Sequence, residues 1–292
     1  MQMRKVLDVA IRFVLSCTGI ILIGALPPFL AGLQRKTLDW GIYWASLKEI
    51  VYSIVHVQDV TYMYLQTEKP LFPFMLEPVM YSLSVMLGAF VLACTAALLM
   101  TIITILFNYR VRRFIKIIFY IFESIPDILI IFIAQLSVIF IFQKSGILLM
   151  DIAALDKQKI YLLPIVCLSI LPTVQLFRLS MIVFEEELNK DYVLLARSIG
   201  LKKLFIVIVH IFRNAVISVF FQSKKTVWFM LSNLFILEYL FNMGGVTLFM
   251  MESLNPKIFT ITLIAFFIPI FIFYTVGEWL IKRKITGGES IS

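Results

Sequence analysis

The stretch PVMYSLSVMLGAFVLACTAALLMTIITILF, residues 78–107, contains no charged residue. A helix crosses the hydrocarbon core of a bilayer when about 20 consecutive residues are mostly apolar, so this stretch is long enough to span a membrane. Runs of similar length and composition lie on both sides of it, at 8–31, 114–142, 160–184, 214–240 and 258–281. The pattern predicts an all-α polytopic membrane protein with six transmembrane helices.

The composition supports the same class. Of the 292 residues, 61% are hydrophobic and 15% are charged, whereas soluble domains average about 25% charged residues. A soluble core could not bury this much apolar surface, so lipid must surround part of the chain. The basic start before the first run could indicate a secretory signal peptide. That run is too long and lacks a small-residue cleavage site, so we predict a retained span.

Basic residues are concentrated in alternate connections between the six runs. The short 108–116 connection, NYRVRRFIK, has four basic residues, and both ends of the chain are also basic. The connections that are poorer in lysine and arginine for their length are 32–77, 143–159 and 241–257. Since lysine and arginine mark the cytoplasmic side of a membrane protein, we predict that both termini and the connection at 184–215 are cytoplasmic. The net charge of +8 has the same explanation.

The predicted outer connection at 32–77 is the longest, and it is rich in tryptophan and tyrosine. Within it, WASLKEIVYSIV (44–55) has apolar residues at helical spacing, which favours a helix at the membrane interface with its rings at headgroup depth. We therefore divide the chain into three parts. These are the first span with its outer connection (1–77), a core of five spans (78–284) and a cytoplasmic tail (285–292).

Cysteine and histidine residues give no sign of a metal or redox centre. Cys17, Cys94 and Cys167 lie far apart inside apolar runs, where cysteine serves as a small apolar residue, so we predict no disulfide framework. His56 and His210 are too few and too distant in sequence for a metal cluster. We expect no metal site.

The stretch FEEELNKDYVLLARSIGLKKLFIVIVHIFRNA, residues 184–215, concentrates mixed charge between two apolar runs. Read as a helix, it begins with three glutamates in its first turn, which suits the helix dipole, and it pairs Glu186 with Lys190 at i,i+4. Gly200 stands where a left-handed C-terminal cap requires glycine. Apolar residues at steps of three and four form a stripe on each side of Gly200. They are Leu188, Tyr192, Leu195, Ala196 and Ile199 before it, and Leu201, Leu204, Phe205 and Ile208 after it.

This pattern predicts two short amphipathic helices, bent at Gly200, on the cytoplasmic surface. They could dock on a partner, or they could be an interfacial connector with no partner.

The same stretch resembles the cytoplasmic loop of permease subunits from the dipeptide, oligopeptide and nickel branch of bacterial ABC importers. Downstream, the segment before the last span also fits that branch, and upstream the fit is weaker; the resemblance covers about 114–282. The residues of the loop that match are Glu186, Asp191, Tyr192, Val193, Ala196, Arg197, Gly200, Leu201, His210, Arg213, Asn214 and Ala215. Those outside the loop are Glu238, Phe241 and Gly245, and more weakly Ser124, Ile125, Pro126 and Arg178.

The resemblance implies a type I ABC importer permease in the bacterial inner membrane, importing peptides or a related small substrate. Residues 185–210 would be the coupling loop that docks on a separate cytoplasmic ATPase, and Glu238 and Gly245 would lie at the outer mouth of the pathway. The implied partners are a homologous second permease, two ATPase subunits and an external substrate-binding protein. ATP and Mg²⁺ would be used by the ATPase, and this chain would bind no cofactor. Dipeptides, longer peptides, signalling peptides and metal chelates such as nickel all stay open as cargo.

The chain departs from that branch at Lys224 and Lys225 in the fifth predicted span, and at Asp127 in the third. A charge near the bilayer centre costs about 2.5–3.5 kcal/mol on insertion scales, so it is expected to have a partner or to face water. Counted from the cytoplasmic side, Asp127 and Lys224 both lie about 16 Å deep. We hypothesise an ion pair between Asp127 and Lys224 or Lys225. Alternatively, the lysines line the substrate pathway or face a wet crevice between subunits.

Two other classes of function have less support in the sequence than an importer permease. A secondary transporter or channel could use Asp127, Glu123 and the two lysines, but the internal repeats common in such carriers are not visible. An enzyme would need a nucleophile and base, or metal ligands, at membrane depth. The sequence contains no HExxH or GxSxG motif, and no GxxxxGK[ST] phosphate-binding loop. We therefore expect a transport subunit that hydrolyses no ATP itself.

Overall fold

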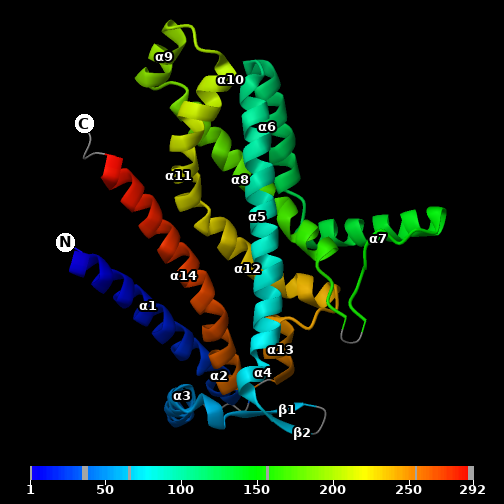
Figure 1. The fold of residues 1–292 in the computed structure, drawn as a ribbon. Helices are drawn as coiled ribbons and strands as arrows, with labels where there is room; N and C mark the ends of the chain where they lie inside the picture. Colours follow the sequence, from blue (N-terminus) through cyan, green and yellow to red (C-terminus); the bar gives the residue numbers. More distant parts are fainter. Residues whose placement is uncertain (1, 35–38, 65–66, 156–157, 254, 289–292) are drawn as a thin grey trace. The chain divides into compact units, whose positions relative to one another are not determined.

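The computed structural model describes residues 2–34, 39–64, 67–155, 158–253 and 255–288, which form helices and one β-hairpin (Figure 1). Within this part of the chain, six helical segments are long and apolar enough to cross a membrane, which confirms the predicted class. They are Leu7–Ala31, Leu71–Leu106, Asp127–Ser145, Leu162–Glu187, Lys203–Gln222 and Pro256–Ile281. The predicted tail 285–292 lies partly outside the described residues, and its described part continues the last helix.

The chain divides into two compact units, residues 1–83 with 244–292, and residues 84–243. In the first unit, α1 and α14 lie side by side, with the Phe13 ring 6.3 Å from that of Phe267 and 5.3 Å from that of Phe271. Gly24 permits close approach, because a Cβ there would lie 1.9 Å from the Thr260 side-chain oxygen. The helices of this unit are α1 (Gln2–Gly24), α2 (Leu26–Gln34), α3 (Trp40–Val55), η1 (Val57–Asp59), α4 (Leu71–Phe74), α13 (Val246–Ser253) and α14 (Pro256–Gly288). Residues of α5 (Leu76–Leu106) belong to both units.

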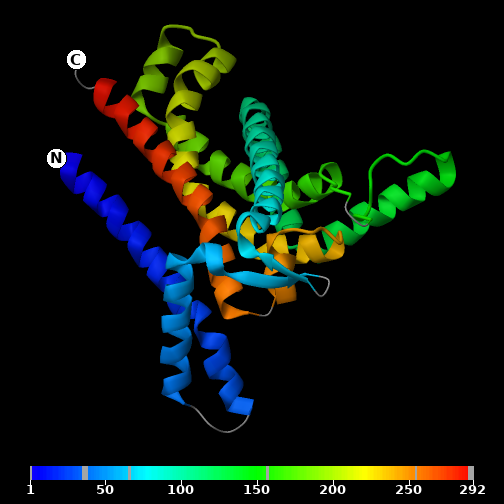
Figure 2. The same ribbon diagram turned by 60° about the horizontal axis from the view of Figure 1, so that its bottom comes forward.

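The long connection at 32–77 is largely ordered structure. Figure 2 shows α2 and α3 as a helical hairpin, which confirms the helix predicted at 44–55. Asp39 caps α3 by accepting a 2.7 Å hydrogen bond from the Gly41 backbone N–H. A two-stranded antiparallel hairpin follows, with β1 (Thr61–Tyr64) paired to β2 (Thr67–Pro70), which was not predicted. A small apolar core formed by Tyr62, Leu71, Met75, Ile258 and Ile261 lies beside it.

The second unit is built around α8 (Leu162–Glu187). The helices that pack against α8 include α6 (Tyr109–Glu123), α7 (Asp127–Ser145), α11 (Phe212–Gln222) and α12 (Lys224–Leu240). The centre of the core is fully buried Phe177, whose ring centroid lies 4.1 Å from that of Phe119 on α6. Ala93 and Ala97 of α5 belong to the same core, because small residues let α5 approach closely.

Two predicted spans have different boundaries in the structure. The run at 114–142 is broken between α6 and α7, because Pro126 has extended backbone angles and lacks the N–H that would continue the helix. The run at 214–240 is broken at Ser223, and the apolar span of that region begins earlier, at Lys203. Asp127 and Lys224 therefore begin new helices instead of lying in the middle of continuous ones. Asp127 is in the first turn of α7, where a negative charge is favourable.

Candidate functional site

The stretch singled out by its mixed charge forms a compact turn between α8 and α11. After α8 ends at Glu187, the chain forms α9 (Asp191–Ser198), the short α10 (Lys203–Phe205) and a π-helical segment, η2 (Ile206–Ile211), that leads into α11. The predicted bend is confirmed, although the second helix is the start of the long segment to Gln222 and is not a separate short one.

Gly200 forms the predicted cap of α9. Its φ of +83° is in the left-handed region that favours glycine. The Leu201 N–H donates to the Ala196 carbonyl at 3.2 Å and the Gly200 N–H to the Arg197 carbonyl at 3.0 Å, so the last turn of α9 is closed by backbone bonds. A Cβ at Gly200 would meet open space, so the requirement for glycine comes from backbone conformation alone.

The three glutamates lie in the last turn of α8, which corrects the prediction that they open a helix. The predicted pair of Glu186 with Lys190 is also wrong, since Lys190 binds Glu187 instead, at 2.5 Å. The reason for both differences is that α8 continues through the glutamates and ends at Glu187. At this end of a helix the dipole disfavours negative charge, so the acidic side chains need cationic partners.

Glu187 is the centre of a buried polar contact that joins three helices. The Tyr192 hydroxyl of α9 donates to the Glu187 carboxylate at 2.5 Å, and the Asn214 side chain of α11 donates to the Tyr192 hydroxyl at 3.4 Å. Burial, and then the hydrogen bond to Glu187, raises the pKa of Tyr192 to about 12. The hydroxyl therefore keeps its proton at neutral pH and can act as the donor.

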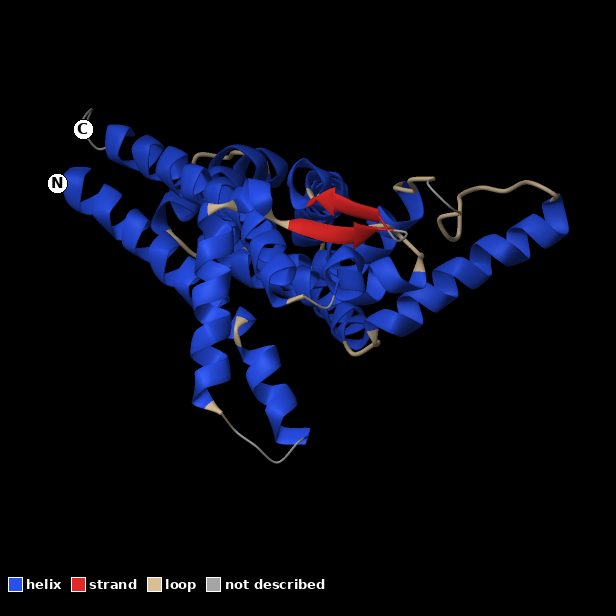
Figure 3. Cartoon of the chain, turned by 90° about the horizontal axis from the view of Figure 1, so that it is seen from below, coloured by secondary structure: helices blue, strands red, loops and turns tan. Residues whose placement is uncertain are grey.

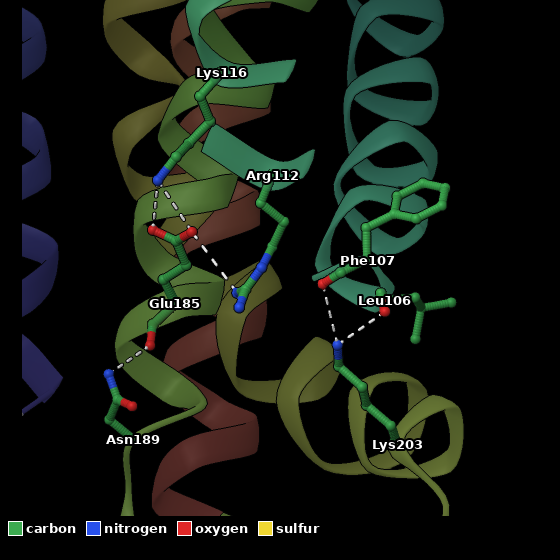
Figure 4. Close-up of polar contacts among 7 residues, drawn as sticks. All are labelled: Leu106, Phe107, Arg112, Lys116, Glu185, Asn189 and Lys203. Atoms are coloured by element: carbon green, nitrogen blue, oxygen red, sulfur yellow. Dashed lines mark hydrogen bonds and ion pairs between the residues drawn. The ribbon is translucent and has the colours of Figure 1, made fainter. Parts of the chain in front are cut away.

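Glu185 connects the end of α8 to α6. Lys116 donates to both carboxylate oxygens of Glu185, at 3.0 and 2.9 Å, and the Arg112 guanidinium lies 3.8 Å away (Figure 4). Arg112 and Lys116 are four residues apart, so they lie on one face of α6 and both reach the same carboxylate. The basic 108–116 stretch therefore has a structural role besides its predicted role in orientation.

Lys203 connects the second half of the loop to the end of α5. Its ammonium donates to the backbone carbonyls of Leu106 at 3.0 Å and Phe107 at 3.5 Å (Figure 4). The last carbonyls of a helix have no partner within the helix, and a cation there also suits the dipole. Glu185 and Lys203 thus hold the loop to α6 and α5.

The apolar residues of α9 divide between two faces. Val193 and Ala196 are buried in the same core as Ile206, Val207 and Ile211. Leu194, Leu195 and Ile199 are 51–68% exposed, and we call these three residues the α9 patch. The predicted stripe is therefore split, because Leu188, Tyr192 and Ala196 face inward while Leu195 and Ile199 face outward.

The remaining predicted loop residues have different surroundings. Asp191 lies in the first turn of α9 and Arg197 in its last turn, which is the favourable arrangement for the helix dipole. The His210 ring packs edge-on against Phe205, with centroids 5.9 Å apart. Glu186 and Arg213 are exposed, and Leu201 packs against the core.

The other predicted residues lie away from the loop. The Asp127 side chain is hydrogen-bonded to the Asn233 side chain of α12, and its pairing with Lys224 or Lys225 stays a prediction. Lys224 is half-buried and Lys225 is exposed. Glu238 is fully buried in the second unit and Gly245 belongs to the first unit, so their shared role at an outer mouth also stays a prediction.

Sequence reasoning missed several contacts. Arg178 of α8 pairs with Glu123 at the end of α6, at 2.8 Å. This pair was missed because the two residues are far apart in sequence. Gln135 of α7 donates to the carbonyls of Ile152 and Leu240, at 3.0 and 3.2 Å. The partners of Glu185 and Lys203 were missed for the same reason. For the two ion pairs, the available signal was the presence of opposite charges near the ends of neighbouring spans. The contacts with backbone carbonyls had no such signal.

Comparison with known proteins places most of the chain in one family. The family model described as "Binding-protein-dependent transport system inner membrane component" matches residues 89–283, which include the whole loop. The chain is also 28% identical over 121 residues to the di/tripeptide transport system permease protein DppB of Pseudomonas aeruginosa (strain UCBPP-PA14). That alignment covers 39% of this chain and 36% of the relative, so only about a third of the relative's length is matched.

Proposed function

Because the chain belongs to the family of binding-protein-dependent transport system inner membrane components, we propose that it is the permease subunit of an ATP-driven importer of peptides or related small molecules. The partial likeness to a di/tripeptide permease supports the peptide class. The observation that carries the proposal is the α9 patch, an exposed apolar surface on a loop fastened to four helices. The family match gives no support to an ion-gradient-driven transporter.

The loop has the properties that a force-transmitting element needs. Its outer side presents apolar side chains, Leu194, Leu195 and Ile199, to a partner. Its inner side is attached to α5 through Lys203 and to α6 through Glu185, and the Glu187 contact joins α8, α9 and α11. A displacement of α9 would therefore move the ends of these helices together, which is what switching between inward- and outward-facing states requires.

The α9 patch would dock on a cytoplasmic ATPase. The complete transporter would contain a second, homologous permease, two ATPase subunits and an external substrate-binding protein, in a bacterial cell membrane. ATP and Mg²⁺ would be bound by the ATPase subunits, since this chain lacks the phosphate-binding loop.

Co-purification of the ATPase with this chain tests the proposal. We expect Leu195→Glu to abolish ATPase binding, because a charge in a desolvated apolar contact is costly. Leu195→Met should keep binding, since it preserves the apolar surface. Gln58→Glu, which adds the same charge at an exposed position of η1, should have no effect. Unchanged ATPase binding in Leu195→Glu, or uptake by the reconstituted chain without any ATPase, would contradict the proposal.

A further inference from the structure

A second exposed apolar surface lies on α3, in the first unit. Trp40, Trp44, Val51, Tyr52 and Val55 are 44–71% exposed, and we call these five residues the α3 stripe. Trp40, Trp44, Lys48, Val51 and Val55 follow one another at steps of three or four, and Tyr52 lies next to Val51 on the same side of the helix. A helix that faces water normally carries polar residues on its exposed side. The exposed face of α3 is therefore too apolar for a helix surrounded by water.

The opposite face of α3 is the one that packs on the protein. Ile50 and Ser53 are buried, and α3 packs against α1, α2 and α14. Apolar residues thus occupy both sides of the helix, and only one side is covered by the first unit. A helix with apolar residues on its exposed side as well as its packed side is typical of surroundings that are partly apolar.

Two polar contacts join α3 to the two spans of the first unit. The Tyr43 hydroxyl donates to the carbonyl of Leu22 at 3.3 Å, near the end of α1 and within the span Leu7–Ala31. Glu49 pairs with Lys257 at 2.5 Å, at the start of the span Pro256–Ile281. The Glu49 contact thus places α3 beside the start of the last span. Figure 3 shows α3 crossing the direction of α1 and α14, as expected for a helix in the plane of the membrane surface.

The stripe also continues the surface of the first span. The Trp40 ring lies 4.9 Å from Phe29 of α2, and α2 contains the last residues of that span. We propose that the α3 stripe is buried in phospholipid, at the boundary between headgroups and acyl chains on the predicted outer surface. Tryptophan and tyrosine are enriched at this depth because their rings are apolar and their N–H or O–H groups are polar. The ammonium of Lys48 would extend to the lipid phosphates.

This inference is independent of the proposed transport function, because it needs only the two spans. Tryptophan fluorescence of the full chain in phosphatidylcholine and phosphatidylglycerol vesicles tests it. Trp228→Phe with Trp279→Phe leaves Trp40 and Trp44 as the emitting residues. We expect phospholipid brominated near the headgroup to remove most of their emission, and phospholipid brominated near the end of the acyl chain to remove much less.

A chain with all four tryptophans changed to phenylalanine and with Gln58→Trp provides the control in water. Its emission should respond to aqueous acrylamide and not to brominated lipid, because Gln58 is exposed on η1 beyond the stripe. The proposal is overturned if Trp40 and Trp44 respond as this control does. It is also overturned if brominated lipid acts equally at both depths, because α3 would then lie inside the hydrocarbon core.

Discussion

The ammonium of Lys203 lies 3.0 Å from the backbone carbonyl oxygen of Leu106, so the start of the helix that leaves the loop is held to the end of α5. The contact uses a carbonyl that the helix itself leaves unpaired. It gives the loop a direct connection to a helix that lies next to the core of the second unit. Under the proposed function, we expect its removal to separate binding of the ATPase from transmission of its motion.

We expect Lys203→Ala to keep ATPase binding but to reduce uptake per ATP hydrolysed, because the α9 patch is intact while its attachment to α5 is lost. The loss of stability should be small, about 1 kcal/mol, since the contact is exposed. The ratio of uptake to ATP hydrolysis in proteoliposomes measures the effect. Lys202→Ala, at the neighbouring exposed residue, is the matched control, and equal effects of the two substitutions would contradict this role of Lys203.

The contact between Glu185 and Lys116 can be tested by exchanging the charges. Glu185→Lys and Lys116→Glu should each lower the unfolding temperature and uptake, because each places like charges together. The double variant should recover only part of the loss, since Arg112 lies 3.8 Å from the original carboxylate and would repel a lysine. The coupling energy should be about 0.5–1 kcal/mol, as for partly exposed ion pairs. Purely additive losses in the double variant would show that Glu185 and Lys116 contribute no coupling energy. Glu252→Lys, at an exposed position of α13 outside the loop, controls for charge alone.

Substitutions of Gly200 should rank by how well each residue accepts a positive φ. Asparagine visits the left-handed region more readily than other residues with a side chain, so Gly200→Asn should be the mildest. Gly200→Ala should cost about 1 kcal/mol and Gly200→Val more, with ATPase co-purification falling in the same order. A Cβ at this position meets open space, so equal behaviour of the three variants would rule out backbone conformation as the cause.

Tyr192→Phe removes the hydroxyl that binds buried Glu187, and we expect a loss of about 1–3 kcal/mol in unfolding free energy. The pH dependence provides a second readout. The pKa of Tyr192 is raised from 10.0 to about 12 in the folded protein, so its stabilising contribution is complete below pH 10 and is lost as the pH rises towards 12. Between these values the wild type should lose stability more steeply than Tyr192→Phe. Parallel curves would show that Tyr192 ionises normally.

Local features of this chain were predictable from its sequence. The six spans follow from length and apolar composition, and the cap at Gly200 follows from a preference that acts over a few residues. The helix at 44–55 has a regular apolar pattern and was predicted for that reason. Span boundaries were less predictable, because apolar composition continues across the breaks at Pro126 and Ser223.

The contacts of the loop were not predictable, because they join residues that are distant in sequence. Glu185 and Lys116 are separated by 69 positions, and a choice among the many basic residues of 108–116 needs the packing of α6 on α8. The outward direction of Leu195 and Ile199 also depends on tertiary packing and was not predictable for that reason. Periodicity places them on a face with Ala196, but tertiary packing covers Ala196 and leaves Leu195 and Ile199 exposed.

The contact between Lys203 and Leu106 also sets an order for biosynthesis. Its two residues are 97 positions apart, so α5 is made long before the lysine that binds its end. The loop can reach its final form only after the ribosome has released α11 and the earlier helices have found their places. A nascent chain that stops before Lys203 would lack this attachment, so α5 stays unfastened to the loop until the later part of synthesis.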